Sequence, residues 1–262
     1  MTDNKKILLI LADGMRPDAM MNCGNTFVRE FLKGSVYTLE GRAVMPSATL
    51  PCIMSLFHSV PTERHGVLDN DWRPQVRPVK GICEVLAAAG KKCGFLYDWE
   101  PLRDLTRVGS IQYSLFAYMS NREESVSHLT EAAIQRIDDD RMDFLFIYFA
   151  LPDALGHKYG YTSGEYREGV RTVWDNIKRI AGACRDKDAY NVIVTADHGG
   201  HERSHGMDIP EDMTIPIIYR GRAFKNLSPS KVKGSSIMDI APTLVHAMGI
   251  PPDPDWEGSV LF

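Results

Sequence analysis

The sequence predicts an α/β protein with a predominantly parallel central sheet and helices on both faces. Two observations lead to this prediction. Short aliphatic runs alternate with stretches of helical periodicity along the chain, and several runs are apolar at every position, as in strands that are buried on both faces. With 262 residues, 44% of them hydrophobic, the chain can bury a large core, and we expect residues 1–262 to form one domain.

In the first half of the chain, the clearest strand is Lys6–Ala12, an aliphatic run that ends at Asp13 and Gly14. Further elements are expected in this order: an extended stretch over Val36–Val44, a helix from Thr49, a helix over Val79–Ala89 with Gly90 as its cap, and a strand within Lys91–Asp98. The region Trp99–Ser120 has no regular pattern, and we expect it to cover a site or to pack beside one.

In the second half, Met142–Ala150 is the most strand-like segment of the sequence. It leads into "ALPDALGHKYG", interpreted as a loop in which Asp153 and His157 stand four residues apart. The other expected elements are a helix over Val126–Ile137, a helix between Ser163 and Ala183, strands over Tyr190–Ala196 and Met213–Gly221, and a closing helix over Met238–Gly249.

Composition limits the classes of partner. The formal net charge of −4 provides no basic field, so a nucleic-acid polymer is not expected as a partner. Apolar runs are too short for a membrane span or a secretory signal. Five scattered cysteines, odd in number and without CxxC spacing, are typical of reduced thiols, which predicts a cytoplasmic protein.

Carboxylates and imidazoles gather where strands are expected to end. A parallel sheet binds ligands outside the carboxyl ends of its strands, so these residues should meet there. They are Asp13, Asp153, His157, Asp197, His198 and one or both of His201 and His205. This set suits Zn²⁺, Mn²⁺ or Fe and is large enough for two ions, as used in phosphoryl transfer. Thr49 would stand at a helix start, where it could meet an anionic group or act only as an N-cap.

These motifs together resemble the alkaline phosphatase superfamily, and within it the nucleotide pyrophosphatase/phosphodiesterase branch. The resemblance rests on "ADGMRPD", "PSATLP", "ERHGVLDN", "LPDALGHKYG" and "TADHGG" in the family's order, with the closing "DIAPTL", "GIP" and "WEG". It extends from Asp13 to Glu257. The resemblance implies a single alkaline-phosphatase-like catalytic domain, here without a large cap domain, that hydrolyses small phosphate esters with two divalent ions, Zn²⁺ or alternatively Mn²⁺.

The resemblance also implies roles for individual residues. Thr49 would be the nucleophile that forms a covalent phospho-enzyme. One ion would be held by Thr49, Asp13, Asp197 and His198, and the second by Asp153, His157 and a third histidine. The segment "SHGMDIPEDMTIP" is similar to the one that supplies this histidine in ethanolamine-phosphate transferases, which indicates His205, with His201 as the alternative.

Two further positions bear on the substrate. Asn70 follows Thr49 by 21 positions, the spacing of the asparagine that contacts a phosphate oxygen in the diesterase branch. The branch commonly has a second asparagine three residues after the nucleophile, where this chain has Cys52, so the pocket differs in detail. Cys52 could be reactive, although a small buried thiol is the simpler interpretation.

We expect phosphodiester hydrolysis. Phosphomonoester or phosphonate hydrolysis and phosphoethanolamine transfer stay open, because the same ions and nucleophile can serve them. A sulfatase is disfavoured because "TLPCI" has no cysteine or serine in a C/S-x-P-x-R context, and a phosphomutase would need an extra cap domain. A non-catalytic metal-binding protein is the alternative from a different class.

Overall fold

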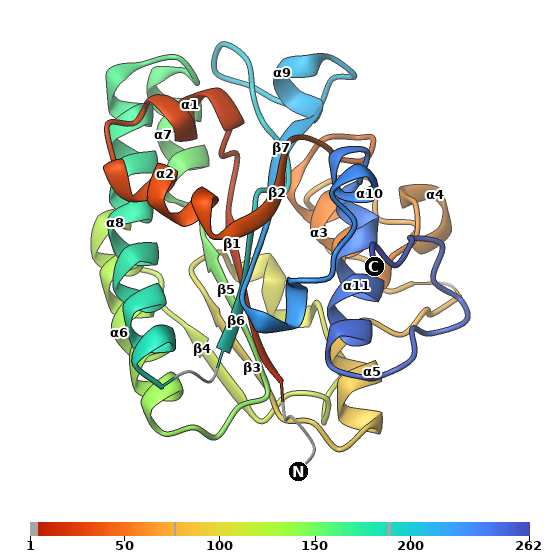
Figure 1. Cartoon of the computed structure of the whole chain (residues 1–262). Helices are drawn as coiled ribbons and strands as arrows, with labels where there is room; N and C mark the ends of the chain where they lie inside the picture. The colour runs from red at the N-terminus through yellow and green to blue at the C-terminus, as the bar shows by residue number, and fades with distance from the viewer. Residues whose placement is uncertain (1–4, 76, 188–189) are drawn as a thin grey trace.

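The computed structural model describes residues 5–75, 77–187 and 190–262, and these contain one seven-stranded sheet (Figure 1). The strand order is β2-β7-β6-β1-β5-β3-β4. The strands are β1 (Lys6–Ala12), β2 (Ser35–Arg42), β3 (Cys93–Tyr97), β4 (Tyr113–Phe116), β5 (Phe144–Phe149), β6 (Tyr190–Thr195) and β7 (Thr214–Arg220).

Most strand pairs are parallel. β1 pairs in parallel with β5 and β6, and β3 pairs in parallel with β5 and β4. β7 runs antiparallel to both β6 and β2. The prediction of a predominantly parallel sheet is therefore confirmed, with β7 as the exception.

Helices cover both faces of the sheet, as predicted (Figure 1). On one face lie α1 (Pro17–Asn22), α2 (Thr26–Lys33), α6 (Arg122–Asp138), α7 (Leu151–Tyr159) and α8 (Gly164–Lys187). On the other lie α3 (Thr49–His58), α4 (Thr62–His65), α5 (Ile82–Ala88), α10 (Pro229–Lys233) and α11 (Ile240–Ala247). Shorter elements are α9 (Pro210–Met213), η1 (Glu100–Asp104), η2 (Arg222–Phe224) and η3 (Ile237–Asp239).

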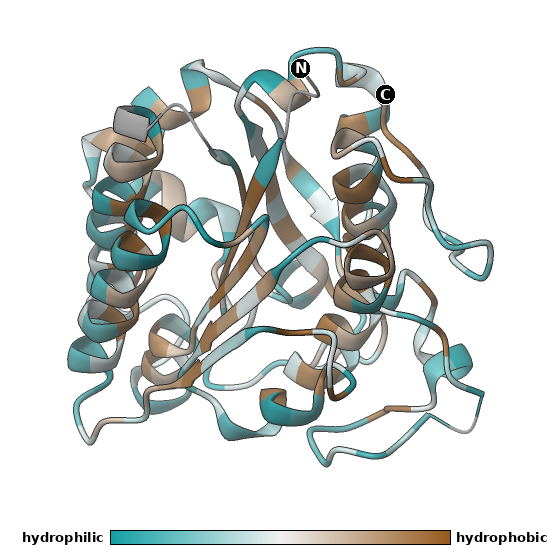
Figure 2. Ribbon diagram, turned by 90° about the horizontal axis from the view of Figure 1, so that it is seen from below, coloured by the Kyte–Doolittle hydropathy of each residue, from teal (hydrophilic) through white to brown (hydrophobic). Residues whose placement is uncertain are grey.

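The core follows from the strand sequences. Every residue of β1, β5 and β6 is buried, since helices cover both sides of these central strands. Figure 2 shows the same pattern, with hydrophobic colour along the central strands and on the helix surfaces that face them. On the described residues no separate cap domain is added to this core, as expected.

Several boundaries differ from those expected. The expected helix over Val79–Ala89 begins only at Ile82, because the Glu84 side chain accepts a hydrogen bond from the Gly81 N–H and fixes the start there. The segment from Ala150 to Gly160, interpreted as a loop, is largely helix α7, with Pro152 in its first turn.

Trp99–Ser120 is more regular than its sequence indicates. It contains the 3₁₀-helix η1 and the edge strand β4, which was not predicted. β4 is four residues long and its side chains alternate between half-buried and exposed, so it lacks the apolar run that marks the central strands. Across the described part of the chain, no helix is long and apolar enough to cross a membrane.

Candidate functional site

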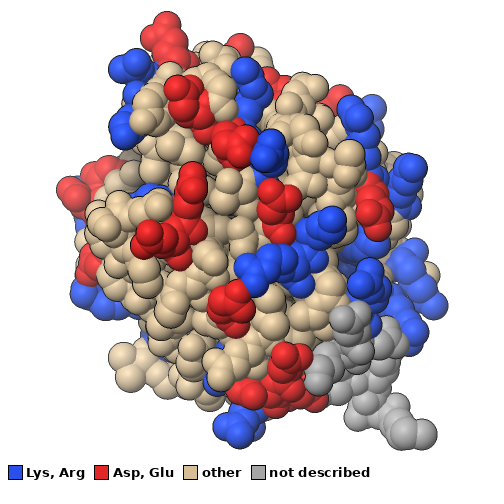
Figure 3. Space-filling view, turned by 90° about the vertical axis from the view of Figure 1, so that its left-hand side faces the viewer, with Lys and Arg blue, Asp and Glu red and all other residues tan. Residues whose placement is uncertain are grey.

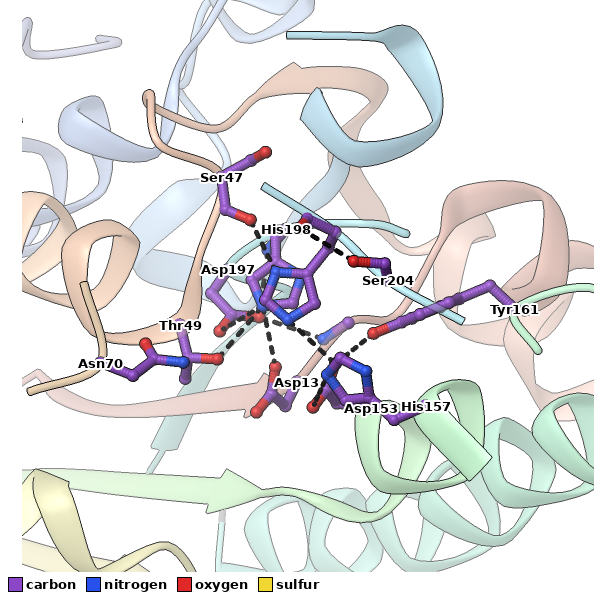
Figure 4. A network of polar contacts seen from close by, with 12 residues as sticks. Asp13, Ser47, Thr49, Asn70, Asp153, His157, Tyr161, Asp197, His198 and Ser204 are labelled. Atoms are coloured by element: carbon purple, nitrogen blue, oxygen red, sulfur yellow. Dashed lines mark hydrogen bonds and ion pairs between the residues drawn. The ribbon is translucent and has the colours of Figure 1, made fainter. Parts of the chain in front are cut away.

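Three neighbouring strands deliver the predicted carboxylates to one place. β1 lies between β6 and β5 in the sheet, and the chain continues from these strands into Asp13, Asp197 and Asp153 respectively. Asp13 directly follows β1, Asp197 comes two residues after β6, and Asp153 lies in the first turn of α7. Figure 4 shows the three side chains converging.

Each of these carboxylates has one oxygen engaged by a donor. The Asp13 Oδ2 accepts a hydrogen bond from the Tyr148 hydroxyl, and the Asp153 Oδ1 accepts one from the Tyr161 hydroxyl. The Asp197 Oδ1 accepts from the backbone N–H groups of Gly14, at 3.1 Å, and His198, at 3.0 Å. The second oxygens of Asp13 and Asp197 are buried without a hydrogen-bond partner.

Three imidazoles are oriented alike around these oxygens. In each, Nδ1–H donates to a backbone carbonyl, so Nε2 is the nitrogen left to act as a ligand. The accepting carbonyls are those of Arg203 for His157 at 2.9 Å, Gly199 for His198 at 2.7 Å and Ser47 for His205 at 2.9 Å. The Nε2 of His198 lies 3.3 Å from Asp13 Oδ1, and that of His157 lies 3.4 Å from Asp153 Oδ2.

His205 and His201 occupy different places. The His205 Nε2 lies 3.8 Å from Asp153 Oδ1, and its ring stacks on that of His198 with centroids 3.8 Å apart. The His201 Nδ1 instead contacts the Asp212 carboxylate at 2.8 Å. Of the two histidines weighed from the sequence, the structure therefore brings His205 to the carboxylate cluster.

Thr49 faces this cluster from the first position of α3. Its Oγ1 lies 3.2 Å from His198 Nε2. The N-cap position is taken by Ala48, and no side chain caps the helix, so the alternative that Thr49 is an N-cap is wrong. The Asn70 Oδ1 accepts the Leu50 N–H at 3.0 Å, which places the Asn70 amide beside Thr49.

The start of α3 offers less to an anion than expected. Of its first three residues, Leu50 has its N–H engaged by Asn70 and Pro51 has none, so Thr49 alone retains that group. An anion bound at the start of α3 would therefore be stabilised mainly by side chains or bound cations.

The electrostatics favour a cation. Burial, followed by the nearby carboxylates of Asp153 and Asp197, raises the pKa of Asp13 well above its usual range. Burial likewise raises the pKa of Asp197. Burial, followed by the proximity of His198, lowers the pKa of His205 to about 4, which leaves its imidazole neutral at pH 7.

The donor set fits divalent ions. Two groups of ligand atoms lie close enough together to share an ion: Asp153, His157 and His205 in one, and Asp13, Asp153 and His198 in the other. The partnerless buried oxygens of Asp13 and Asp197 point to the same conclusion, because buried carboxylate oxygens are otherwise satisfied. Mixed carboxylate and imidazole ligands suit Zn²⁺ or Mn²⁺.

Sequence reasoning missed three residues beside the site. Asp98 directly follows β3 and accepts the Ala150 N–H at 2.9 Å, so it holds the chain where α7 begins. The rule that selected the other strand-end carboxylates would have found it. Tyr148 and Tyr161 carry no comparable sequence signal, because tyrosine is common in buried strands and turns.

Cys52 is a buried thiol, in agreement with the simpler of its two interpretations. Its Sγ contacts the carbonyl oxygens of Val44 at 3.7 Å and Pro46 at 3.8 Å. Burial raises the pKa of this thiol, which disfavours the reactive thiolate.

The fold and these motifs are those of the alkaline phosphatase superfamily. A model of the family "Type I phosphodiesterase / nucleotide pyrophosphatase" matches residues 7–212, and the chain belongs to this family. The resemblance stated from the sequence is thereby confirmed.

Solved structures share the fold across nearly the whole chain. Murine ectonucleotide pyrophosphatase/phosphodiesterase 5, an inactive variant in complex with AMP, has a TM-score of 0.80 at 15% identity, with 97% of each chain covered. The phosphonate monoester hydrolase of Agrobacterium radiobacter has a TM-score of 0.74 at 14% identity, covering 98% of this chain and 76% of that one.

A curated relative is the 2,3-bisphosphoglycerate-independent phosphoglycerate mutase of Clostridium botulinum. It is 27% identical over 169 residues, which are 62% of this chain and 32% of the mutase. This chain thus spans about a third of the length of the curated relatives it matches.

Proposed function

We propose that this protein is a metal-dependent hydrolase of phosphoric esters, with phosphodiesters as its main substrates and Thr49 as its nucleophile. The observation that carries the proposal is the position of the Thr49 hydroxyl, 3.2 Å from His198 Nε2 and beside a cluster of carboxylate and imidazole ligand atoms. A hydroxyl needs such surroundings, because it is a poor nucleophile alone.

The proposed ligands divide into two sets. Asp13, Asp197, His198 and Thr49 would hold one ion, and Asp153, His157 and His205 would hold the other. Zn²⁺ is the preferred metal and Mn²⁺ the alternative. Such ions would supply Lewis acidity and positive charge against the phosphoryl oxygens and lower the pKa of bound hydroxyl groups.

The chain's own residues support a two-step reaction. In the first step, Thr49 Oγ1 forms a bond to phosphorus and the bond to the leaving alcohol breaks. The alcohol departs with the proton of the Thr49 hydroxyl, and Thr49 is left esterified to a phosphoryl group that, for a diester, still carries the second alcohol. In the second step, water attacks the same phosphorus, and the bond to Thr49 breaks to regenerate the hydroxyl. The Asn70 amide would orient a phosphoryl oxygen from beside the nucleophile.

The first experiment identifies the ester class. Purified protein loaded with Zn²⁺ or Mn²⁺ is assayed with p-nitrophenyl phosphate, its bis-ester and p-nitrophenyl phenylphosphonate. Fastest turnover of the bis-ester is expected. A preference for the monoester or the phosphonate would replace the proposed substrate, and no turnover with both ions bound would favour a non-catalytic protein. Nucleotide diesters are assayed next, since the structure of the murine protein is a complex with AMP.

The second experiment tests the nucleophile. We expect Thr49→Ala to lower kcat by more than about 10³-fold while the metal content stays intact, because the covalent step is lost. Acid quench during turnover of a ³²P-labelled ester should trap ³²P covalently bound to Thr49 in the wild type only. Thr130→Ala is the control, since it removes another buried hydroxyl, bonded to Val126 O within α6. Near-normal activity of Thr49→Ala would rule out the covalent step.

The cellular setting is proposed on the same basis. Residues 1–262 would act as one catalytic domain on small phosphate esters in the cytoplasm, because the five cysteines are free and buried. Acidic and basic side chains are interspersed over much of the face seen in Figure 3, with basic ones gathered towards its right-hand edge. We propose no nucleic-acid polymer as a partner, because the formal net charge is −4. Fractionation of cells that produce the protein from its own gene tests the location.

A further inference from the structure

Two buried tyrosines contact carboxylates of the site, and each contacts a different proposed ligand. Tyr148, on β5, donates its hydroxyl to Asp13, and Tyr161, just after α7, donates its hydroxyl to Asp153. Both side chains are essentially inaccessible to solvent, with 0% and 1% of their surface exposed. Neither residue is one of the proposed ligands.

These hydrogen bonds determine which oxygen each carboxylate presents. Tyr148 occupies Asp13 Oδ2 and leaves Oδ1, which is buried without a partner and 3.3 Å from His198 Nε2. Tyr161 donates to Asp153 Oδ1, which also lies 3.8 Å from His205 Nε2, and leaves Oδ2, which lies 3.4 Å from His157 Nε2. A carboxylate held in this way loses less rotational freedom when it binds an ion.

Two glycines, Gly156 and Gly200, lie against the Tyr161 ring. A Cβ placed on Gly156 would lie 2.6 Å from its Cε1, and one on Gly200 would lie 2.4 Å from it, so both positions need glycine. The Tyr161 N–H donates to the Glu202 carbonyl at 2.8 Å. The ring therefore fills the space between α7, which carries Asp153 and His157, and the loop after β6, which carries His198.

We propose that Tyr148 and Tyr161 are positioning residues, each of which acts mainly on the affinity of one ion position, through Asp13 and through Asp153 respectively. Tyr148 serves the position of Asp13, Asp197 and His198. Tyr161 serves the position of Asp153, His157 and His205. This inference rests on the two-ion site of the proposed function.

The test is a metal titration of single-atom deletions. Metal-free Tyr148→Phe and Tyr161→Phe are titrated with Zn²⁺ by calorimetry, and Zn²⁺ anomalous scattering from crystals grown at limiting Zn²⁺ identifies the weakened position. We expect each variant to bind one Zn²⁺ about 10- to 100-fold more weakly and to change the affinity for the other Zn²⁺ much less. The weakened positions should be the Asp13 and Asp153 positions respectively.

The control is Tyr190→Phe, which removes a buried hydroxyl that donates to Met142 O at the opposite end of the sheet. It should bind both ions as the wild type does. Wild type that binds no Zn²⁺ would refute the two-ion site itself. Wild type that binds two ions, with both phenylalanine variants unchanged, would refute only the role of the tyrosines. If one of the two variants does not fold, the Zn²⁺ affinity of the other variant tests the proposal.

Discussion

At the residue scale, local hydrogen bonds determine which nitrogen or oxygen atom of each side chain in the site remains available to a ligand. His157, His198 and His205 all use Nδ1 on backbone carbonyls, and Asp197 uses Oδ1 on two backbone N–H groups. Each side chain is thus held in one orientation before any ligand arrives. Orientation of this kind is what distinguishes His205 from His201, since both follow the same strand in the sequence and only one reaches Asp153.

The first prediction separates these two histidines. We expect His205→Ala to lower the bound metal from two equivalents to one, because its Nε2 lies beside Asp153. His201→Ala should keep both equivalents, since its imidazole contacts Asp212 instead. Metal content is measured by mass spectrometry of the elements after gel filtration. Loss of an ion from His201→Ala, with His205→Ala unchanged, would reverse the assignment.

At the scale of single elements, the position of α7 depends on the absence of a side chain at Gly156. It begins directly after β5, with Pro152 in its first turn, and carries Asp153 and His157 on one face, four residues apart. Gly156 lies between them and costs intrinsic helix stability. The close approach of Tyr161 explains its presence, because any side chain there would meet the ring.

The second prediction tests that close approach. Gly156→Ala should destabilise the fold by about 1–3 kcal/mol, because overpacking against a buried ring outweighs the gain in helix propensity. Gly182→Ala in α8 is the matched control. It has open space around its Cβ position and should stabilise the fold by about 0.5–1 kcal/mol. Urea unfolding measures both, and a stabilising Gly156→Ala would contradict the packing argument.

At the scale of the whole molecule, the strand order creates the site. β1 is first in sequence but central in the sheet, between β6 and β5. Asp13 therefore meets Asp153 and Asp197 at one edge, although each lies more than 100 residues further along the chain. Asp98 extends this arrangement to β3, where its carboxylate is fully buried and its Oδ2 lies 3.9 Å from Arg122 Nη1. Burying this charge should lower the stability of the whole fold.

The third prediction uses pH to detect the loss of folding stability that the buried Asp98 charge causes. Burial raises the pKa of Asp98 from 3.8 to about 7, although the Ala150 N–H and Arg122 oppose the shift. Below pH 3.8 the carboxyl is neutral in both folded and unfolded chains and costs nothing. As pH rises from about 4 to 7, the unfolded chain ionises first, so this group lowers the folding stability by about 1.4 kcal/mol per pH unit, about 4 kcal/mol in all.

Asp98→Asn should remove this dependence while it keeps an acceptor for the Ala150 N–H. Relative to wild type, the variant should therefore gain stability between pH 4 and pH 7 and no more above pH 7. Chemical unfolding of metal-free protein at several pH values measures the difference. Parallel stability profiles for the two proteins would show that Asp98 does not titrate in this range.

Much of the fold could be predicted because the central strands are apolar at every position. β1 has the predicted bounds Lys6–Ala12, and β5 and β6 lie within the predicted segments. The edge strand β4 and helix α7 could not be identified in this way. β4 is half exposed and short, and α7 contains proline and glycine, which are typical of turns.

By itself, the sequence determined the fold class, the family and the set of residues that carry the proposed chemistry, because periodicity and motif order are local properties of the chain. Only the tertiary structure decided that His205 rather than His201 lies beside Asp153, and that Tyr148, Tyr161 and Asp98 surround the site. These relations depend on which strands become neighbours and on which side-chain atoms are already hydrogen-bonded. Neither is encoded in the spacing of residues along the chain.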